Sequence, residues 1–453
     1  MKKSLIALAA LAATGAFAQS SVTLYGRAEA GVDLGYKETV NGSASSFGVV
    51  AGVVGPTTTV ATPSSSYKPG FRVTDGQTQG QGSSRFGMRG TEDLGGGLKA
   101  NFVLEAGVNI DDGSSGNGGG NLFSRAAWVG LSGGFGEVRL GRQVLGSFGV
   151  HANGLAAGAA SGLYEAGANI VQGGVRFANA IQYRSPDFGG ISGTVSLRAP
   201  ESNSAATSVA ASLVPDTTDG TVANPKNKSG IDLSIAYANG PIYVGFGFNR
   251  QSNTTAFNNN EAGLLNNATS GDAKITDYAL SASYNFGVAQ PFFSYVNRKN
   301  VTSGSSVTLG VPGTNGLASL APTANSNTQN PVFGAAGANS KSRQYTFGVK
   351  VPVGAATLIA AYGDMKTTGS GSNINNNVLI SSNAVEAKTR AFQIGAQYPL
   401  SKRTMLQANY GQNKTTADTG LVNAITGPTT FNSSGTNTTS KVQSLNFGVQ
   451  HLF

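Results

Sequence analysis

Apolar and polar residues alternate with a period of two along much of this chain. Within residues 22–36 the even positions are apolar or small, whereas the odd positions include Arg27, Glu29 and Asp33. Successive side chains of a β-strand point to opposite faces, so this alternation indicates strands with one apolar face and one polar face. The same rhythm recurs in the ranges 98–106, 229–239, 241–250, 274–286, 355–365 and 444–453.

Two kinds of connection, short turns and long polar loops, alternate between these segments. Seven short turns are expected at residues 93–97, 132–134, 186–190, 239–241, 285–287, 352–354 and 399–402. Eight long loops, rich in Ser, Thr, Asn, Gly and Ala, are expected at 37–82, 109–120, 144–175, 199–228, 251–271, 299–341, 367–385 and 414–438. These connections would join sixteen antiparallel strands and place every long loop at the same end.

A closed transmembrane β-barrel accounts for both patterns. A strand that meets lipid must satisfy its backbone hydrogen bonds within the sheet, and only closure achieves this for every strand. A barrel of this size is too wide for side chains to fill, so the polar faces line water. We therefore predict an all-β, 16-stranded, up-and-down antiparallel barrel. A soluble exported β-solenoid or an adhesin sandwich is the alternative, and neither requires the strict alternation of loop lengths.

The first residues have the pattern of an export signal. Lys2 and Lys3 precede an apolar stretch at 4–11, and the triplet at 16–18, Ala-Phe-Ala, fits a cleavage site. We expect residues 1–18 to be a signal peptide and 19–453 to form the outer-membrane barrel. Loss of the two lysines would lower the formal charge from +9 to +7.

Composition argues against several kinds of chemistry. The chain has no cysteine and only two histidines, His151 and His451, which leaves little for a disulfide scaffold, a catalytic triad or a metal site. The match to G-x-S-x-G at residues 130–134 falls in an expected short turn between strands, and no P-loop motif is present. We expect no enzymatic activity, cofactor or metal. The export signal and the scatter of basic residues along strands also argue against nucleic-acid binding.

Several segments resemble the general porins of Gram-negative bacteria, most closely the betaproteobacterial type. These segments are 21–27, 84–98, 124–131, 135–143, 183–188 and the terminal 448–453. The resemblance implies a homotrimer in the outer membrane, a third loop folded into each pore, and contact with membrane lipid and lipopolysaccharide. It also implies that Phe453 is read by the outer-membrane insertion machinery, and that small anions and hydrophilic solutes pass through the pore.

Matching these segments to the family places an arginine ladder at the pore constriction, formed by Arg27, Arg85, Arg125 and Arg176. Arg27 and Arg85 occupy the alternate positions that form the polar faces of their strands, which supports their place in the ladder. Glu105 lies on the polar face of its own strand, near enough to hold an arginine in place. Further lumen candidates are Arg89, Arg142, Arg184, Glu29 and Asp33.

The expected third loop, 144–175, carries a single acidic residue, Glu165. Porins of this kind usually place several carboxylates opposite the arginines, so this departure from the family predicts a positive constriction. Confined charge of one sign focuses the electric field and favours ions of the opposite sign, here anions.

Three further expectations remain. The long loops 37–82 and 299–341 favour, as an alternative function, a surface adhesin or receptor that uses the barrel as an anchor. Phe447 and Phe453 are expected to face outward in the aromatic girdle. Trp128 is expected to face outward too, because its parity is opposite to that of Arg125.

Overall fold

The computed structural model of the chain describes residues 21–50, 53–59, 64–67, 71–75, 84–116, 122–155, 176–200, 227–257, 269–304, 339–375, 378–419, 422–426, 429–433 and 436–453. The expected signal peptide, Glu165 and much of the loops 37–82 and 299–341 lie outside these residues. Among the described residues, no helix is long and apolar enough to cross a bilayer.

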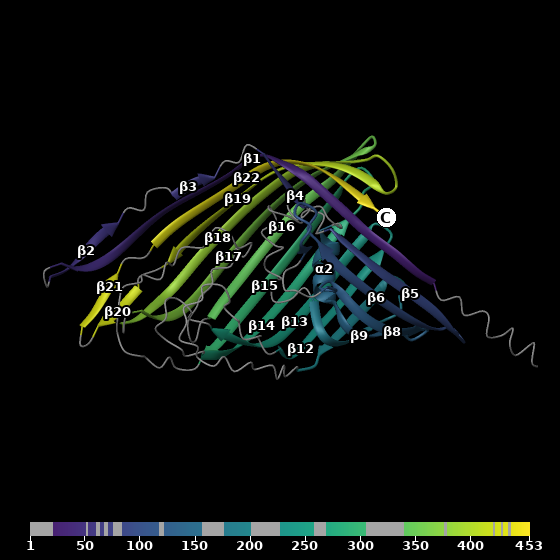
Figure 1. The fold of residues 1–453 in the computed structure, drawn as a ribbon, viewed down its shortest axis with the longest axis horizontal. Helices are drawn as coiled ribbons and strands as arrows, with labels where there is room; N and C mark the ends of the chain where they lie inside the picture. Colours follow the sequence, from purple (N-terminus) through teal and green to yellow (C-terminus); the bar gives the residue numbers. More distant parts are fainter. Residues whose placement is uncertain are drawn as a thin grey trace, which may run out of the picture.

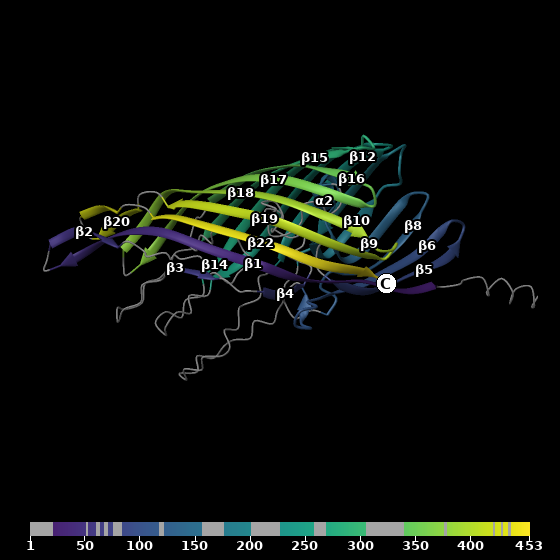
Figure 2. The same cartoon turned by 90° about the horizontal axis from the view of Figure 1, so that it is seen from above.

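Sixteen strands pair with their neighbours in chain order and close into an antiparallel barrel, as predicted (Figures 1 and 2). Closure occurs where β1 pairs with β22, which joins residues 27–43 of the first strand to the end of the chain. The barrel strands are β1 (Ser21–Val50), β5 (Arg85–Gly95), β6 (Leu98–Val108), β8 (Ala126–Gly133), β9 (Gly136–Val144), β10 (Arg176–Arg184), β11 (Ile191–Arg198), β12 (Asn227–Asn239), β13 (Ile242–Phe257), β14 (Thr269–Tyr284), β15 (Gln290–Gly304), β16 (Asn339–Val353), β17 (Ala356–Asn375), β18 (Val378–Pro399), β19 (Thr404–Thr419) and β22 (Thr436–Leu452).

Six shorter strands extend the sheet at the end that carries the long connections. Three of them pair with β1, one with β6, and the remaining two form a hairpin that pairs with β18. They are β2 (Val53–Thr59), β3 (Ser64–Tyr67), β4 (Phe71–Asp75), β7 (Ser115–Gly116), β20 (Val422–Thr426) and β21 (Thr429–Ser433).

All seven short turns lie where the sequence predicted them, between successive barrel strands. The long connections differ from the prediction, because several begin later than expected. Residues 367–375 and 378–385, for example, continue β17 and β18 as one long hairpin rather than forming a loop. About 9–11 residues of a tilted strand cross the hydrocarbon layer, so strands of 20 and 22 residues project well beyond it.

Apolar side chains face outward and polar ones inward. Leu24 is 63% exposed, whereas Asp33 on the opposite face of the same strand is fully buried. Phe447 and Phe453 are exposed on the outer surface, as predicted. The largest share of the buried side chains is polar, with Ser, Thr, Asn and Gln of β11–β22 prominent. This inside-out distribution is that of a membrane barrel around a polar lumen.

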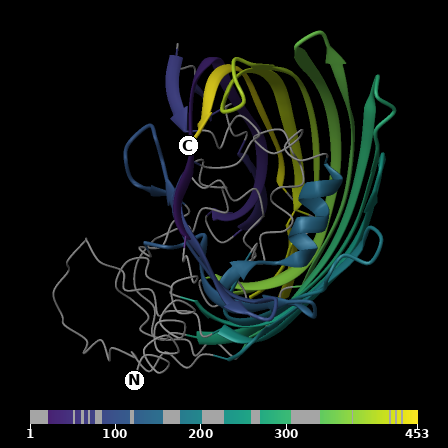
Figure 3. The same cartoon turned by 90° about the vertical axis from the view of Figure 1, so that its right-hand side faces the viewer.

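A short helix, α2 (Gly146–Gly154), lies inside the ring of strands (Figure 3). Leu145 at its start packs with Phe177 and Ala180, and Leu155 at its end packs with Phe292 and Ile359. Hydrogen bonds fix its middle to the wall, since Ser147 bonds Asp232 and the His151 ring bonds Ser294 at 2.7 Å. Residues 156–175 are outside the described part, so the inward fold of the whole third loop stays a prediction.

The expectation that Trp128 faces outward is wrong. Val129 and Leu131 are the exposed residues of β8, and Trp128 lies on the other face, where its ring contacts the Arg139 guanidinium. The parity argument failed because Arg125 lies in a bend before β8, which begins at Ala126. Period-two alternation holds only within the strand, so both residues reach the lumen.

Candidate pore constriction

Arg27 and Arg85 lie directly opposite one another on the neighbouring strands β1 and β5. Both occupy the polar parity of their strands, so both side chains point into the lumen, as the sequence indicated. Two like charges in this register repel each other unless carboxylates compensate them. The Nε atom of Arg27 lies 3.6 Å from Glu29, and the Nε atom of Arg85 lies 3.7 Å from Glu105.

Glu105, in the second half of β6, connects three side chains of this wall. Its Oε1 atom accepts a hydrogen bond from Arg125 Nε at 2.7 Å, and its Oε2 atom accepts one from the Tyr25 hydroxyl at 3.0 Å. Oε2 is also the oxygen nearest to Arg85. One carboxylate therefore orients two arginines, and it leaves the local charge positive.

Arg176, at the start of β10, lies within electrostatic range of Arg125, Arg85 and Glu105, and also of Arg142. Its Nε atom is buried and has no hydrogen-bond partner in the described part of the chain. A bulge between Phe177 and Ala180 reverses the alternation here, so Phe177 takes the fully buried position beside α2. We call Arg27, Arg85, Arg125 and Arg176 the arginine cluster.

Two acids on β1 have polar partners deeper in the wall. Gln407 of β19 donates a hydrogen bond to Glu29 at 2.5 Å, and Ser444 of β22 donates one to Asp33 at 3.1 Å. Both acids are buried. Glu29 therefore offsets part of the charge of Arg27, while Asp33 belongs to the seam that closes the barrel.

The remaining lumen candidates lie around the cluster rather than in it. Arg89 stands over the Tyr25 ring at 5.2 Å, and Arg142 donates a hydrogen bond to the Ser124 carbonyl at 2.6 Å. Arg184 lies nearer the short turns, beside Glu137 and Arg139. Glu165 is outside the described residues, and no group of three possible metal ligands occurs within them.

One lumen feature was missed by the sequence analysis. Arg139 stacks on the Trp128 ring at 4.0 Å, and its NH2 group bonds Glu137 at 2.6 Å. The alternation along β9 places residues 137, 139 and 143 on one polar face, and this pattern would have predicted that Arg139 faces the lumen.

The closed ring also sets the arginines against α2. β1 and β5 are the first two strands of the ring, and the wall that holds α2, β12–β15, lies about half a turn away. A lumen bordered by charged side chains on one wall and by a fixed helix on the other defines the class of this protein. It is a transmembrane β-barrel channel.

Comparisons with known proteins give the family. A model of Gram-negative porins matches residues 4–418, so the chain belongs to that family. Porin 32 of Delftia acidovorans is 31% identical over 93% of this chain and 92% of its own length. An outer membrane porin of Bordetella pertussis is 29% identical over 91% and 95% of the two chains.

Solved structures agree with the fold. The anion-selective porin from Comamonas acidovorans is 25% identical, covers 96% of this chain and 100% of its own, and superposes with a TM-score of 0.50. The trimer form of OmpT from Vibrio cholerae shares the fold, with 14% identity over 96% and 99% of the chains and a TM-score of 0.50. The chain is an outer-membrane porin, and its relatives are channels rather than enzymes.

Proposed function

We propose that the chain forms an anion-preferring diffusion channel whose narrowest part lies between the arginine cluster and the segment that contains α2. The observation that supports this is the charge balance of the cluster. Four arginines interact there with two glutamates, Glu29 and Glu105. The porin from Comamonas acidovorans, which is 25% identical to this chain, is anion-selective, and this supports the same assignment.

The expected selectivity is moderate. Two unit charges about 4 Å apart interact by ~1 kcal/mol in bulk water and by several times that at a lower effective dielectric. A passing anion exchanges part of its hydration for guanidinium donors, which are rigid and permanently charged. A net difference of ~1.4 kcal/mol between anion and cation gives tenfold discrimination. The two glutamates reduce the effect, as does salt, because the Debye length falls to ~3 Å at 1 M.

A salt-gradient measurement tests the proposal. In a planar bilayer with unequal KCl on the two sides, the zero-current potential should have the sign of chloride preference, and it should shrink as total salt rises. The double variant Arg85→Ser/Arg125→Ser should shift it toward potassium. A parent channel that prefers potassium at low salt contradicts the assignment of the constriction, and a reconstituted protein without conductance contradicts a channel of any kind.

We also propose a homotrimer. The trimeric form of OmpT, which shares the fold, supports it. Chemical crosslinking of the folded protein in outer-membrane vesicles should stop at three chains. A ladder that ends at one chain contradicts the trimer.

Export and insertion complete the proposal at the two chain ends. We expect cleavage after Ala18 and a mature chain that starts at Gln19, which intact-mass measurement of the outer-membrane protein tests directly. Phe453 is proposed as the residue that the insertion machinery reads. Its backbone already pairs with Gly26 of β1, and the ring lies on the outer surface.

Contact with lipopolysaccharide is proposed from a set of outward cations on the later strands. Like charges stand directly opposite one another at Lys299–Lys341, Arg343–Lys366, Lys366–Lys388, Arg390–Lys414 and Lys414–Lys441. These eight residues form the outer cation belt. Asp364 and Glu386 offset it in part, through ion pairs with Arg390, Lys366 and Lys388.

The belt lies where lipid phosphates are expected. Lys366 is ten residues beyond the start of β17 at Ala356, which is about the length that crosses the hydrocarbon layer. Like charges opposite one another destabilise a sheet. Phosphate groups at the membrane surface would turn this repulsion into charge-assisted hydrogen bonds.

The variant Lys366→Gln/Lys388→Gln/Lys414→Gln should retain several-fold less lipopolysaccharide through purification than the parent. The matched control is Lys99→Gln/Lys402→Gln/Arg403→Gln, which removes the same charge at the short-turn end. Equal retention by both variants contradicts the proposal.

A further inference from the structure

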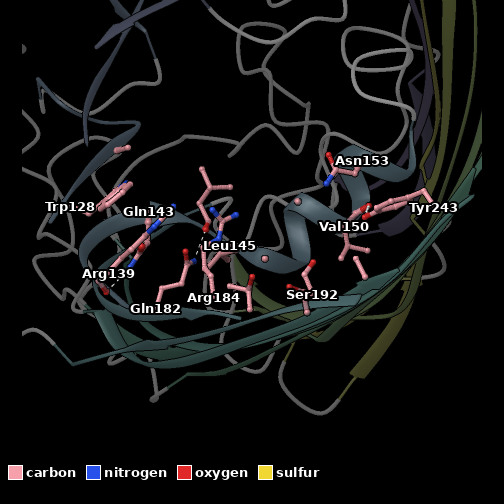
Figure 4. A pocket seen from close by; sticks show the side chains of 17 residues that line it. Trp128, Arg139, Gln143, Leu145, Val150, Asn153, Gln182, Arg184, Ser192 and Tyr243 are labelled. Atoms are coloured by element: carbon pink, nitrogen blue, oxygen red, sulfur yellow. Dashed lines mark hydrogen bonds between the residues drawn. The ribbon is translucent and has the colours of Figure 1, made fainter. Parts of the chain in front are cut away.

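A cavity of about 220 Å³ lies in the lumen between α2 and the wall, on the short-turn side of the helix (Figure 4). One end is formed by Trp128 and Arg139, Arg184 lies beside Leu145 nearer the middle, and the other end is formed by Asn153 of α2 and Tyr243 of β13. A water occupies about 30 Å³ of liquid, so the cavity has room for roughly seven waters or one small organic molecule.

The charged side chains favour an anion. Arg139 and Arg184 are both close to Glu137, which bonds Arg139 at 2.6 Å, so two guanidinium groups share one carboxylate. Glu137 acts on Arg184 through its charge alone, and the exposed Arg184 side chain has no hydrogen-bond partner among the described residues. The buried Nε atom of Arg139 also has no hydrogen-bond partner there. Donors without acceptors in a partly closed site bind a carboxylate well.

The apolar side chains favour a flat ring. Trp128 is the single tryptophan of the chain, and it faces the lumen although the neighbouring β8 positions 129 and 131 face lipid. Leu145 and Val150 contribute further apolar surface from the helix segment. Aromatic rings pack on one another in offset or edge-to-face geometry, and a stacked guanidinium adds to the attraction for a π system.

The wall is shaped to keep this corner open. Gly130 lies opposite Arg139 in the β8–β9 ladder, and a Cβ atom there would come within 3.2 Å of the Arg139 Cγ atom. The backbone of Gly141 has φ +129°, and a Cβ on it would collide with the Ala127 carbonyl oxygen and lie 3.0 Å from the Trp128 Cα atom. These two glycines let β8 and β9 approach closely beside Trp128 and Arg139.

We propose that this cavity is a binding site for a single-ring aromatic carboxylate on its way through the pore. Arg184 would bind the carboxylate, Arg139 would assist from the edge of its guanidinium group, and the ring would lie between Trp128 and Leu145. The site is separate from the arginine cluster, so a test of this proposal is independent of the ion preference proposed above.

Because the chain has one tryptophan, its fluorescence excited at the red edge of the spectrum reports on this site alone. Benzoate added to the detergent-solubilised full chain should change the Trp128 emission saturably and reduce single-channel current. Acetate, which lacks the ring, and benzylammonium, which has the opposite charge, should do neither at the same concentration.

Arg184→Gln should weaken the benzoate midpoint at least tenfold, and Arg184→Lys should be intermediate because it keeps the charge without the planar fork. Arg250→Gln is the matched control, since Arg250 is exposed on the outer side of β13. The heat-dependent gel mobility of the folded barrel checks that each variant folds. Equal responses to benzoate and acetate, or an unchanged midpoint in a folded Arg184→Gln, overturn the site. Neither result bears on the zero-current potential, which tests the constriction separately.

Discussion

At the scale of single residues, Glu105 determines how much positive charge the constriction presents. It contacts Tyr25, Arg85 and Arg125, and Gln in its place keeps the shape while removing the charge. Glu105→Gln should raise the chloride-to-potassium permeability ratio a few-fold, because a unit charge near the ion path is worth ~1 kcal/mol in water. The measurement is the zero-current potential in a KCl gradient.

The control is Glu386→Gln, which removes a carboxylate paired with Lys366 and Lys388 on the outer surface. It should leave the potential unchanged. An unchanged potential in Glu105→Gln would show that this carboxylate does not face the ion path.

Side-chain parity predicted individual residues well inside regular strands. Arg27, Arg85 and Glu105 point into the lumen as expected, because the ladder between β1, β5 and β6 is unbroken around them. Parity failed for Trp128, whose reference residue lies in a bend, and it does not carry through the bulge that precedes Ala180. Bends and bulges depend on backbone pairing with distant strands, which a single sequence does not reveal.

At the scale of elements, the packing of α2 against the barrel wall depends on a glycine, Gly154. A Cβ atom on Gly154 would collide with Ser281 of β14. Gly154→Val should therefore push the end of the helix off the wall and change single-channel conductance, since overpacking costs ~1–3 kcal/mol. Single-channel recordings measure this.

Two further variants make the Gly154 prediction specific. Ser281→Gly removes the colliding atom and should restore the parental conductance in the double variant. Gly149→Ala, in the same helix but with open space around the added methyl, should behave as the parent. A double variant that stays altered would place the effect somewhere other than this contact.

The sequence predicted strands better than it predicted what lies between them. The helix has three glycines among nine residues, so its intrinsic propensity is low and nothing in the pattern suggested it. Packing of Leu145 and Leu155 at its two ends holds it instead. The extensions of β17 and β18 were likewise expected as loop, since Asn and Gly are poor strand signals. The cross-strand ladder orders them instead.

At the scale of the whole molecule, closure joins the two chain ends through close contact. Gly26 and Phe453 exchange two backbone hydrogen bonds, at 2.9 and 3.2 Å, and the Phe453 ring lies over Gly26. Gly26→Val should displace the ring and weaken closure by ~1–3 kcal/mol. Loss of the heat-resistant folded band on a gel at a lower temperature than the parent measures this.

Ala30→Val adds a similar side chain farther along the outward face of β1 and serves as the control. It should melt as the parent does. A Gly26→Val barrel that is as heat-resistant as the parent would show that the terminal ring is free to move without cost.

The architecture as a whole was predictable because it repeats. The alternation of short and long connections predicted sixteen strands. Several loops are shorter than predicted, but this does not change the number of strands. The position of the arginine cluster needed the resemblance to a family, since distances across a barrel are set by closure and not by local spacing.

The outer end of the long β17–β18 hairpin lies beyond the strand length that crosses the membrane, whereas the arginine cluster lies on other strands. The two strands are paired through their backbones from Thr357–Gln397 to Asn375–Val378. Such backbone pairing does not depend on which side chains the outermost residues carry. Residues at the outer end of this hairpin can therefore be exchanged without a change in the arginine cluster, whose members lie on or beside β1, β5, β8 and β10. Substitutions at that outer end should leave the permeability of the channel unchanged.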